Sequence, residues 1–197
     1  MRLLLASKSA ARRAMLEAAG IAFQPVEAEL DEEAAKGGLW GAGFDARGVA
    51  EELAQLKALS AAAPPGDLVL GSDQTLERDD GTLLGKPASR DEAWGQLVSL
   101  RGATHRLHSA AVIAAGGEAV WWHCETVSLT MRPFSDAFLR DYLDREWEHV
   151  RWSVGGYRIE GPGVQLFDRI EGSHFAILGM PLLPLLAYLR ERGLAPS

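Results

Sequence analysis

One stretch of the chain, LVLGSDQTLERDDGTLLGKP at residues 68–87, constrains the fold more than any other. It opens with three apolar residues, Leu68–Leu70, which have the length and composition of a short buried strand. A polar pair that includes Asp73 follows, and a DDG turn then returns the chain to Lys86. The pattern predicts a β-hairpin that brings the carboxylate of Asp73 close to the ammonium of Lys86.

This hairpin has two interpretations. A carboxylate and an ammonium at adjoining strand ends suit a metal-bound, anionic substrate such as a nucleotide phosphate. Gly85, next to the lysine, would let a ligand approach the backbone. The alternative is a surface hairpin with an ordinary ion pair. The stretch alone does not decide between them.

Composition limits the class of protein. The 197 residues predict one domain, residues 1–197, which is large enough to bury a real core. The net charge of -7 argues against a nucleic-acid polymer or an anionic membrane as partner, although not against a nucleotide. The single cysteine, Cys124, excludes an internal disulfide and a cysteine-rich zinc site. No apolar run fits a signal peptide or the ~20 residues of a membrane helix, so we expect a cytoplasmic protein.

The start of the chain offers a second anion site. A strand at residues 2–6 runs directly into a helix that Ser9 caps and Gly20 ends. The junction carries the hydroxyls of Ser7 and Ser9 and cations that include Arg12. Helix N-termini with such features bind phosphates. The alternative is a capped helix whose arginines are only solvated.

The remaining segments alternate between strand and helix patterns. Residues 36–48 predict a flexible glycine-rich loop, and the acidic run that includes Asp31 and Glu32 suits either a site or a helix entry. The other predicted elements are strands at 21–30, 107–114 and 118–131, helices at 49–62, from Ser89, from Ser135 and from Pro181, and a hairpin with arms at 164–167 and 175–178. This order predicts an α/β fold with a mixed, twisted sheet flanked by helices.

Several of these pieces together resemble the Maf family of nucleoside triphosphate pyrophosphatases. The resemblance covers nearly the whole chain in order. The motifs that carry it are LASKSAAR at 5–12, the acidic pair at 31–32, LAQLKA at 53–58, GSD at 71–73, LGKP at 84–87, GGYRIEG at 155–161, IEGS at 170–173 and LGMP at 178–181. Each motif is weak by itself, but their order and spacing together are specific.

The resemblance implies hydrolysis of a nucleoside triphosphate between the α and β phosphates, with a divalent cation, Mg or Mn, as cofactor. It also implies an elongated α/β fold shared with inosine triphosphate pyrophosphatases, with the site in a cleft between two lobes. The matching positions give each residue a role. Asp73 matches the catalytic base, Lys57 and Lys86 would offset charge, Ser7, Ser9 and Arg12 would hold phosphates, and Glu32, Asp31 and Asp73 would hold the metal.

Two positions bear on the base. Gln74 and Glu160 resemble the branch of the family that acts on 7-methyl-GTP, whereas the dTTP/UTP branch has Thr and Gln there. A carboxylate such as Glu160 suits a guanine edge, because it accepts hydrogen bonds from N1–H and the exocyclic amine. Ala10 and Ala11 depart from both branches, which puts a stacking wall or a cation for the base in doubt. The resemblance favours a methylated guanine nucleotide.

Other functions stay open at this point. A dTTP/UTP pyrophosphatase of the same family is one, and a phosphatase that removes single γ-phosphates is another. A third is a nucleotide-binding regulator of septum formation without significant catalysis. A homodimer is also possible. A binding module has no need of Asp73 together with two lysines and an acidic pair, which favours the enzyme.

Overall fold

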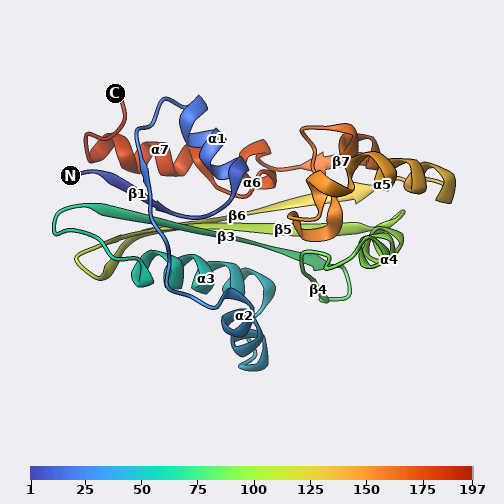
Figure 1. The fold of residues 1–197 in the computed structure, drawn as a ribbon, viewed down its shortest axis with the longest axis horizontal. Coiled ribbons are helices and arrows are strands. Elements are labelled where there is room, and N and C mark those ends of the chain that lie inside the picture. Colours follow the sequence, from blue (N-terminus) through green and yellow to red (C-terminus); the bar gives the residue numbers. More distant parts are fainter. Residues whose placement is uncertain (197) are drawn as a thin grey trace. The chain divides into compact units, whose positions relative to one another are not determined.

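Seven strands form one mixed sheet in the order β2-β1-β3-β5-β6-β7, with β4 paired to β3 (Figure 1). The computed structural model describes residues 1–196. Strand β1 is parallel to β2 and β3, whereas the β3–β4 and β6–β7 pairs are antiparallel. The strands are β1 (Leu3–Ala6), β2 (Gln24–Pro25), β3 (Leu68–Arg78), β4 (Leu83–Leu84), β5 (Thr104–Ala115), β6 (Glu118–Met131) and β7 (Phe167–Glu171). The predicted mixed α/β sheet is confirmed.

Helices flank this sheet, and none of those in the described part of the chain is both long and apolar enough to span a bilayer. The α-helices are α1 (Ala10–Ala18), α2 (Glu32–Gly41), α3 (Ala46–Ser60), α4 (Arg90–Leu100), α5 (Asp136–Val150), α6 (His174–Ile177) and α7 (Leu182–Glu191). Two short 3-10 helices are η1 (Val154–Gly156) and η2 (Pro162–Leu166).

The chain divides into two compact units. Unit 1 comprises residues 1–74, 109–125 and the described residues from 173 on, and unit 2 comprises residues 75–108 and 126–172. Strands β3, β5 and β6 each contribute residues to both units.

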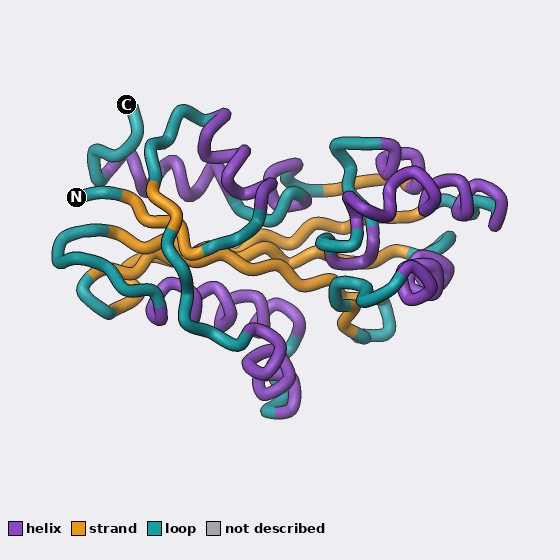
Figure 2. Tube along the Cα trace, in the orientation of Figure 1, coloured by secondary structure: helices purple, strands orange, loops and turns teal. Residues whose placement is uncertain are grey.

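Unit 1 buries both faces of its strands, and Figure 2 shows its helices on either side of them. Alternate residues of β1 explain this arrangement, because successive side chains of a strand point to opposite faces. Leu3 and Leu5 pack with α1 and α7, whereas Leu4 packs with α3. A strand buried on both faces is uniformly apolar, as the sequence LLLA of β1 is.

A glycine lets α3 lie directly on β3. An ideal Cβ built on Gly71 would lie 2.1 Å from the carbonyl oxygen of Ala54 and 2.6 Å from the amide nitrogen of Ala58. No side chain fits at those distances, so only glycine permits this approach. The close packing brings Lys57, which lies between those two residues in α3, to the strand that carries Asp73.

The predicted hairpin is confirmed, but its first strand is longer than expected. Leu76 pairs with Leu84 and Glu77 with Leu83. Strand β3 continues to Arg78, so Asp73 lies within the strand and not beyond its end. Asp73 forms an ion pair with Lys57, and its expected approach to Lys86 stays a prediction.

The predicted loop at 36–48 was wrong for its first part, because helix α2 covers residues 32–41. Asp31 is its N-cap, and its carboxylate accepts a hydrogen bond from the Ala34 amide at 3.0 Å. Two glutamates in the first turn add a favourable interaction with the helix dipole. Glycines inside the helix lower its intrinsic propensity, which is why the sequence pattern favoured a loop.

Two further predictions of strands need correction. Of residues 21–30, only Gln24–Pro25 pair with β1, and the Val26 amide adds one more hydrogen bond, to the Leu5 carbonyl at 3.0 Å. The predicted hairpin near residue 170 is also wrong. Strand β7 pairs with β6 instead, with Ser128 opposite Glu171, and residues 174–177 form helix α6. The partner of β7 is β6, which lies far from it in the sequence, and a local sequence pattern does not identify such a partner.

Candidate active site

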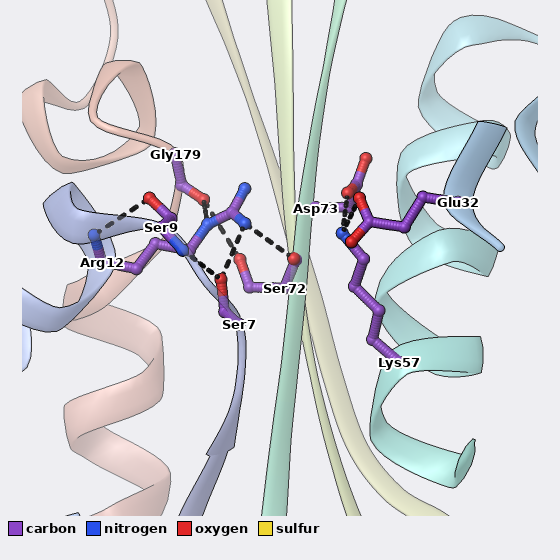
Figure 3. A network of polar contacts seen from close by, with 8 residues as sticks. All are labelled: Ser7, Ser9, Arg12, Glu32, Lys57, Ser72, Asp73 and Gly179. Carbon is purple, nitrogen blue, oxygen red and sulfur yellow. Dashed lines mark hydrogen bonds and ion pairs between the residues drawn. The ribbon is translucent and has the colours of Figure 1, made fainter. Parts of the chain in front are cut away.

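A buried ammonium lies between two carboxylates on unit 1 (Figure 3). Lys57 Nζ donates to Asp73 Oδ1 at 2.6 Å and to Glu32 Oε2 at 2.8 Å. The Lys57 side chain is 5% exposed, that of Asp73 13% and that of Glu32 46%. The lysine is therefore shielded, while both acids retain access to solvent.

Three separate elements position this triad. Lys57 comes from the last turn of α3, Asp73 from β3, and Glu32 from the first residue of α2. The two carboxylates outnumber the ammonium, so the triad holds one net negative charge. One oxygen of each carboxylate accepts a charge-assisted hydrogen bond from the buried ammonium.

The triad suits a hard divalent cation, because carboxylate oxygens are the ligands such ions prefer. No group of three or more His, Cys, Asp or Glu side chains that could hold a metal occurs within residues 1–196. A cation here would thus take its other ligands from substrate phosphates and water, as Mg²⁺ commonly does. Asp31, the third predicted ligand, uses one oxygen to cap α2.

Arg12 lies on the other side of β3 from the triad (Figure 3). Ser72 and Asp73 are consecutive in the strand, so they face opposite sides of the sheet. Arg12 donates from Nε to the Gly179 carbonyl at 2.8 Å and from Nη1 to the Ser72 carbonyl at 2.9 Å and to Ser7 Oγ at 3.2 Å.

The environment of Arg12 leaves one nitrogen available. Burial lowers the pKa of its guanidinium, and the negative charges of Asp73 and Glu32 oppose that effect. An arginine remains a cation in either case. Its Nη2 has no hydrogen-bond partner in the part of the chain that the structure describes. This nitrogen can donate to an anion while the rest of the side chain stays fixed.

The two predicted serines both take part in the start of α1. Ser9 is the N-cap, and its Oγ accepts from the Arg12 amide at 3.4 Å. Ser7 Oγ accepts from the Ser9 amide at 3.3 Å as well as from the Arg12 side chain. The structure thus brings Ser7, Ser9 and Arg12 together, and their contact with substrate stays a prediction.

The amide nitrogen of Gln74, a residue predicted to lie at the base, is fully used in hydrogen bonds within the protein. Its Nε2 donates to Ser109 Oγ at 2.8 Å and to the carbonyls of Ala176 at 2.8 Å and Ile177 at 3.1 Å. Ser109 Oγ donates to the Ala176 carbonyl at 2.6 Å. The amide nitrogen therefore fastens α6 to the sheet, and only the amide oxygen remains for a ligand.

Sequence reasoning missed two buried serines of this framework. Ser72 Oγ donates to the Gly179 carbonyl at 3.1 Å, and Ser109 connects Gln74 to α6. A signal was present, since both are polar residues inside apolar strand runs, where a buried hydroxyl needs a partner. The partner of Ser72 is the Gly179 carbonyl, which lies 107 residues away in the sequence, so no local pattern identifies it.

The two remaining predicted residues belong to unit 2. Lys86 is exposed and forms no ion pair with another described residue. Glu160 is exposed at a turn, also without a polar partner among the residues described. Its neighbour Arg158 pairs with Glu146 instead, so an ion pair between Arg158 and Glu160 does not account for Glu160.

Comparison with known proteins identifies the family of this chain. A family profile described as "Maf-like protein" matches residues 2–192. The chain is 49% identical to the nucleoside triphosphate pyrophosphatase of Sphingopyxis alaskensis, with all of both chains covered. It is 50% identical to the protein of that name from Paramagnetospirillum magneticum, over 96% of this chain and 98% of the relative. A 7-methyl-GTP pyrophosphatase of Brucella abortus is 42% identical over 97% and 96%. With its motifs matched from end to end, the chain belongs to the Maf family.

Proposed function

We propose that this chain is a nucleoside triphosphate pyrophosphatase that hydrolyses the bond between the α and β phosphates. The products are a nucleoside monophosphate and pyrophosphate. The observation that carries the proposal is the buried Lys57 ammonium between the carboxylates of Asp73 and Glu32, in a chain of the Maf family. The relatives are named as pyrophosphatases of nucleoside triphosphates, which supports the same reaction.

Asp73 is the proposed general base. Its carboxylate takes a proton from a water molecule, the water oxygen bonds to phosphorus, and the bond to the pyrophosphate oxygen breaks. Lys57 donates to Oδ1 at 2.6 Å and thereby holds the carboxylate in place for this step. Arg12 Nη2 and the N-terminus of α1 are the donors proposed to hold phosphate oxygens.

A divalent cation is part of the proposal. Asp73 and Glu32 would hold it, and it would neutralise phosphate charge that the protein leaves uncompensated. Excess EDTA should therefore abolish turnover, and added Mg²⁺ or Mn²⁺ should restore it. Thermal unfolding in EDTA is the control, because the apoprotein should remain folded. Full turnover in EDTA would contradict a metal-dependent reaction.

The proposed substrate is 7-methyl-GTP. Support comes from Glu160, an exposed carboxylate without a protein partner among residues 1–196, and from the name of the Brucella relative. The test is kcat/KM for 7-methyl-GTP, GTP, dTTP and UTP, with pyrophosphate release as readout. A maximum for dTTP or UTP would overturn the choice of base. Release from none of the four would overturn the enzyme and favour a nucleotide-binding regulator.

Glu160→Gln tests base recognition directly. The amide keeps the size of the side chain but replaces one acceptor with a donor, so a guanine edge loses a hydrogen bond. The expected loss in kcat/KM for 7-methyl-GTP is ~1–3 kcal/mol, with a much smaller change for UTP. Asp168→Asn, another exposed acid of unit 2, should leave both values unchanged. Equal losses on the two substrates would exclude Glu160 from base selection.

We also infer a cytoplasmic location, where nucleoside triphosphates are made and used. The homodimer stays a prediction, for which sedimentation of the purified chain is the direct measurement.

A further inference from the structure

Glu146 is a buried carboxylate that the proposed reaction does not use. It lies in α5 on unit 2 and is 7% exposed. Its Oε2 accepts from Arg158 Nε at 3.1 Å and lies 3.0 Å from Arg158 Nη2. Buried ion pairs are costly to desolvate and often add little to stability, so a gain in stability does not by itself account for this pair.

Arg158 organises the turn that carries Glu160. An ideal Cβ on Gly161 would lie 3.2 Å from Arg158 Nε, and one on Gly163 would lie 2.3 Å from the Arg158 carbonyl oxygen. The chain therefore folds back closely around the arginine. Residues 159–161 form the turn, and Glu160 lies exposed within it.

The residue before Arg158 is anchored separately. The Tyr157 hydroxyl and His105 Nε2 lie 2.7 Å apart in a buried hydrogen bond. Burial lowers the pKa of His105 to about 4, so the ring is neutral near pH 7. This bond fixes the start of the segment. The next side chain, Arg158, is held by Glu146.

The pairing of Arg158 also decides the charge near Glu160. Arg158 lies two residues before Glu160 in the sequence, and an ideal Cβ on Gly161, the residue after Glu160, would lie 3.4 Å from Arg158 Nη2. By occupying Nε and Nη2, Glu146 leaves the Glu160 carboxylate free to accept from a ligand.

We propose that Glu146 is a positioning residue for base selection, which holds Arg158 and thereby presents an unpaired Glu160 to the guanine edge. The inference rests on the proposed function, since it requires that Glu160 contacts the base. Under this proposal, Glu146 affects the preference between substrates and does not take part in the chemical step.

The test compares Glu146→Gln with Glu160→Gln, singly and combined, on 7-methyl-GTP and UTP. The amide at residue 146 keeps its volume and one acceptor but removes the charge that holds Arg158. We expect kcat/KM for 7-methyl-GTP to fall roughly tenfold, mainly through KM, with UTP changed less than about twofold. The double variant should lose no more selectivity than Glu160→Gln alone, because both changes act on one contact.

Glu148→Gln is the matched control. Glu148 lies in the same helix and pairs with Arg151, but it is 74% exposed, so its loss should leave both substrates unchanged. Thermal unfolding of each variant separates a folding defect from a change in selectivity.

The outcomes distinguish the two proposals. If Glu160→Gln leaves the ratio between the substrates unchanged, base reading by Glu160 fails. If it changes the ratio but Glu146→Gln lowers both substrates equally, Glu146 only supports the fold and the inference is overturned. Additive losses in the double variant would also overturn it, because the residues would then act independently.

Discussion

Asp73→Asn should lower turnover by ~10²-fold or more while the protein stays folded, as the loss of a general base does. Asparagine has the size of aspartate, and its oxygen can still accept from Lys57, so the packing of the triad is kept. Its amide cannot take a proton from water, however. The measurement is kcat with saturating Mg²⁺ and substrate, together with the thermal unfolding midpoint.

Asp79→Asn is the matched control for this change. Asp79 lies in the turn of the same hairpin and is exposed, so its substitution should leave kcat unchanged. Near-normal turnover of Asp73→Asn would show that Asp73 is not the base.

Gly71→Ala is the second change with a large expected effect. The added methyl group would lie 2.1 Å from the carbonyl oxygen of Ala54, a backbone atom that cannot turn aside. Helix α3 must therefore shift away from β3, at a cost of roughly 3 kcal/mol or more in the free energy of unfolding. The same shift moves Lys57 from Asp73, so kcat should fall as well. Urea unfolding and kcat are the measurements.

Gly95→Ala gives a control for the substitution itself. Gly95 lies in α4, where an added Cβ meets nothing within 4 Å. Alanine there should be neutral or stabilising by up to ~1 kcal/mol, because alanine favours helices more than glycine does. A Gly71→Ala variant as stable as Gly95→Ala would refute the close packing of α3 on β3.

Gly71 and Gly95 differ in their packing, which the sequence does not state although it predicts the elements that carry them. The GSD motif pointed to Asp73 through its family resemblance, and the apolar run at 68–70 with the DDG turn placed it in a hairpin. The sequence could not say which cation pairs with Asp73, which in the structure is Lys57. That choice depends on the approach of α3 to Gly71, a contact between segments far apart in the chain.

The same reason limits what the sequence could say of two other residues, whose predicted roles stay predictions. Asp31 was expected among the metal ligands, yet its carboxylate caps α2, a helix whose glycines favoured a loop. Gln74 was expected at the base, yet its amide nitrogen bonds the Ala176 carbonyl, 102 residues away. Local pattern predicts caps and strands. It does not predict to which carbonyl, far away in the sequence, a buried amide donates its hydrogen bond.

The identity of the reaction products tests the central proposal most directly. Phosphorus-31 NMR can follow 7-methyl-GTP with Mg²⁺ and the purified chain, with Asp73→Asn as the blank. We expect pyrophosphate and 7-methyl-GMP to appear in equal amounts from the first time point, with no diphosphate intermediate. Formation of orthophosphate and 7-methyl-GDP instead would contradict cleavage between the α and β phosphates and indicate removal of the γ-phosphate.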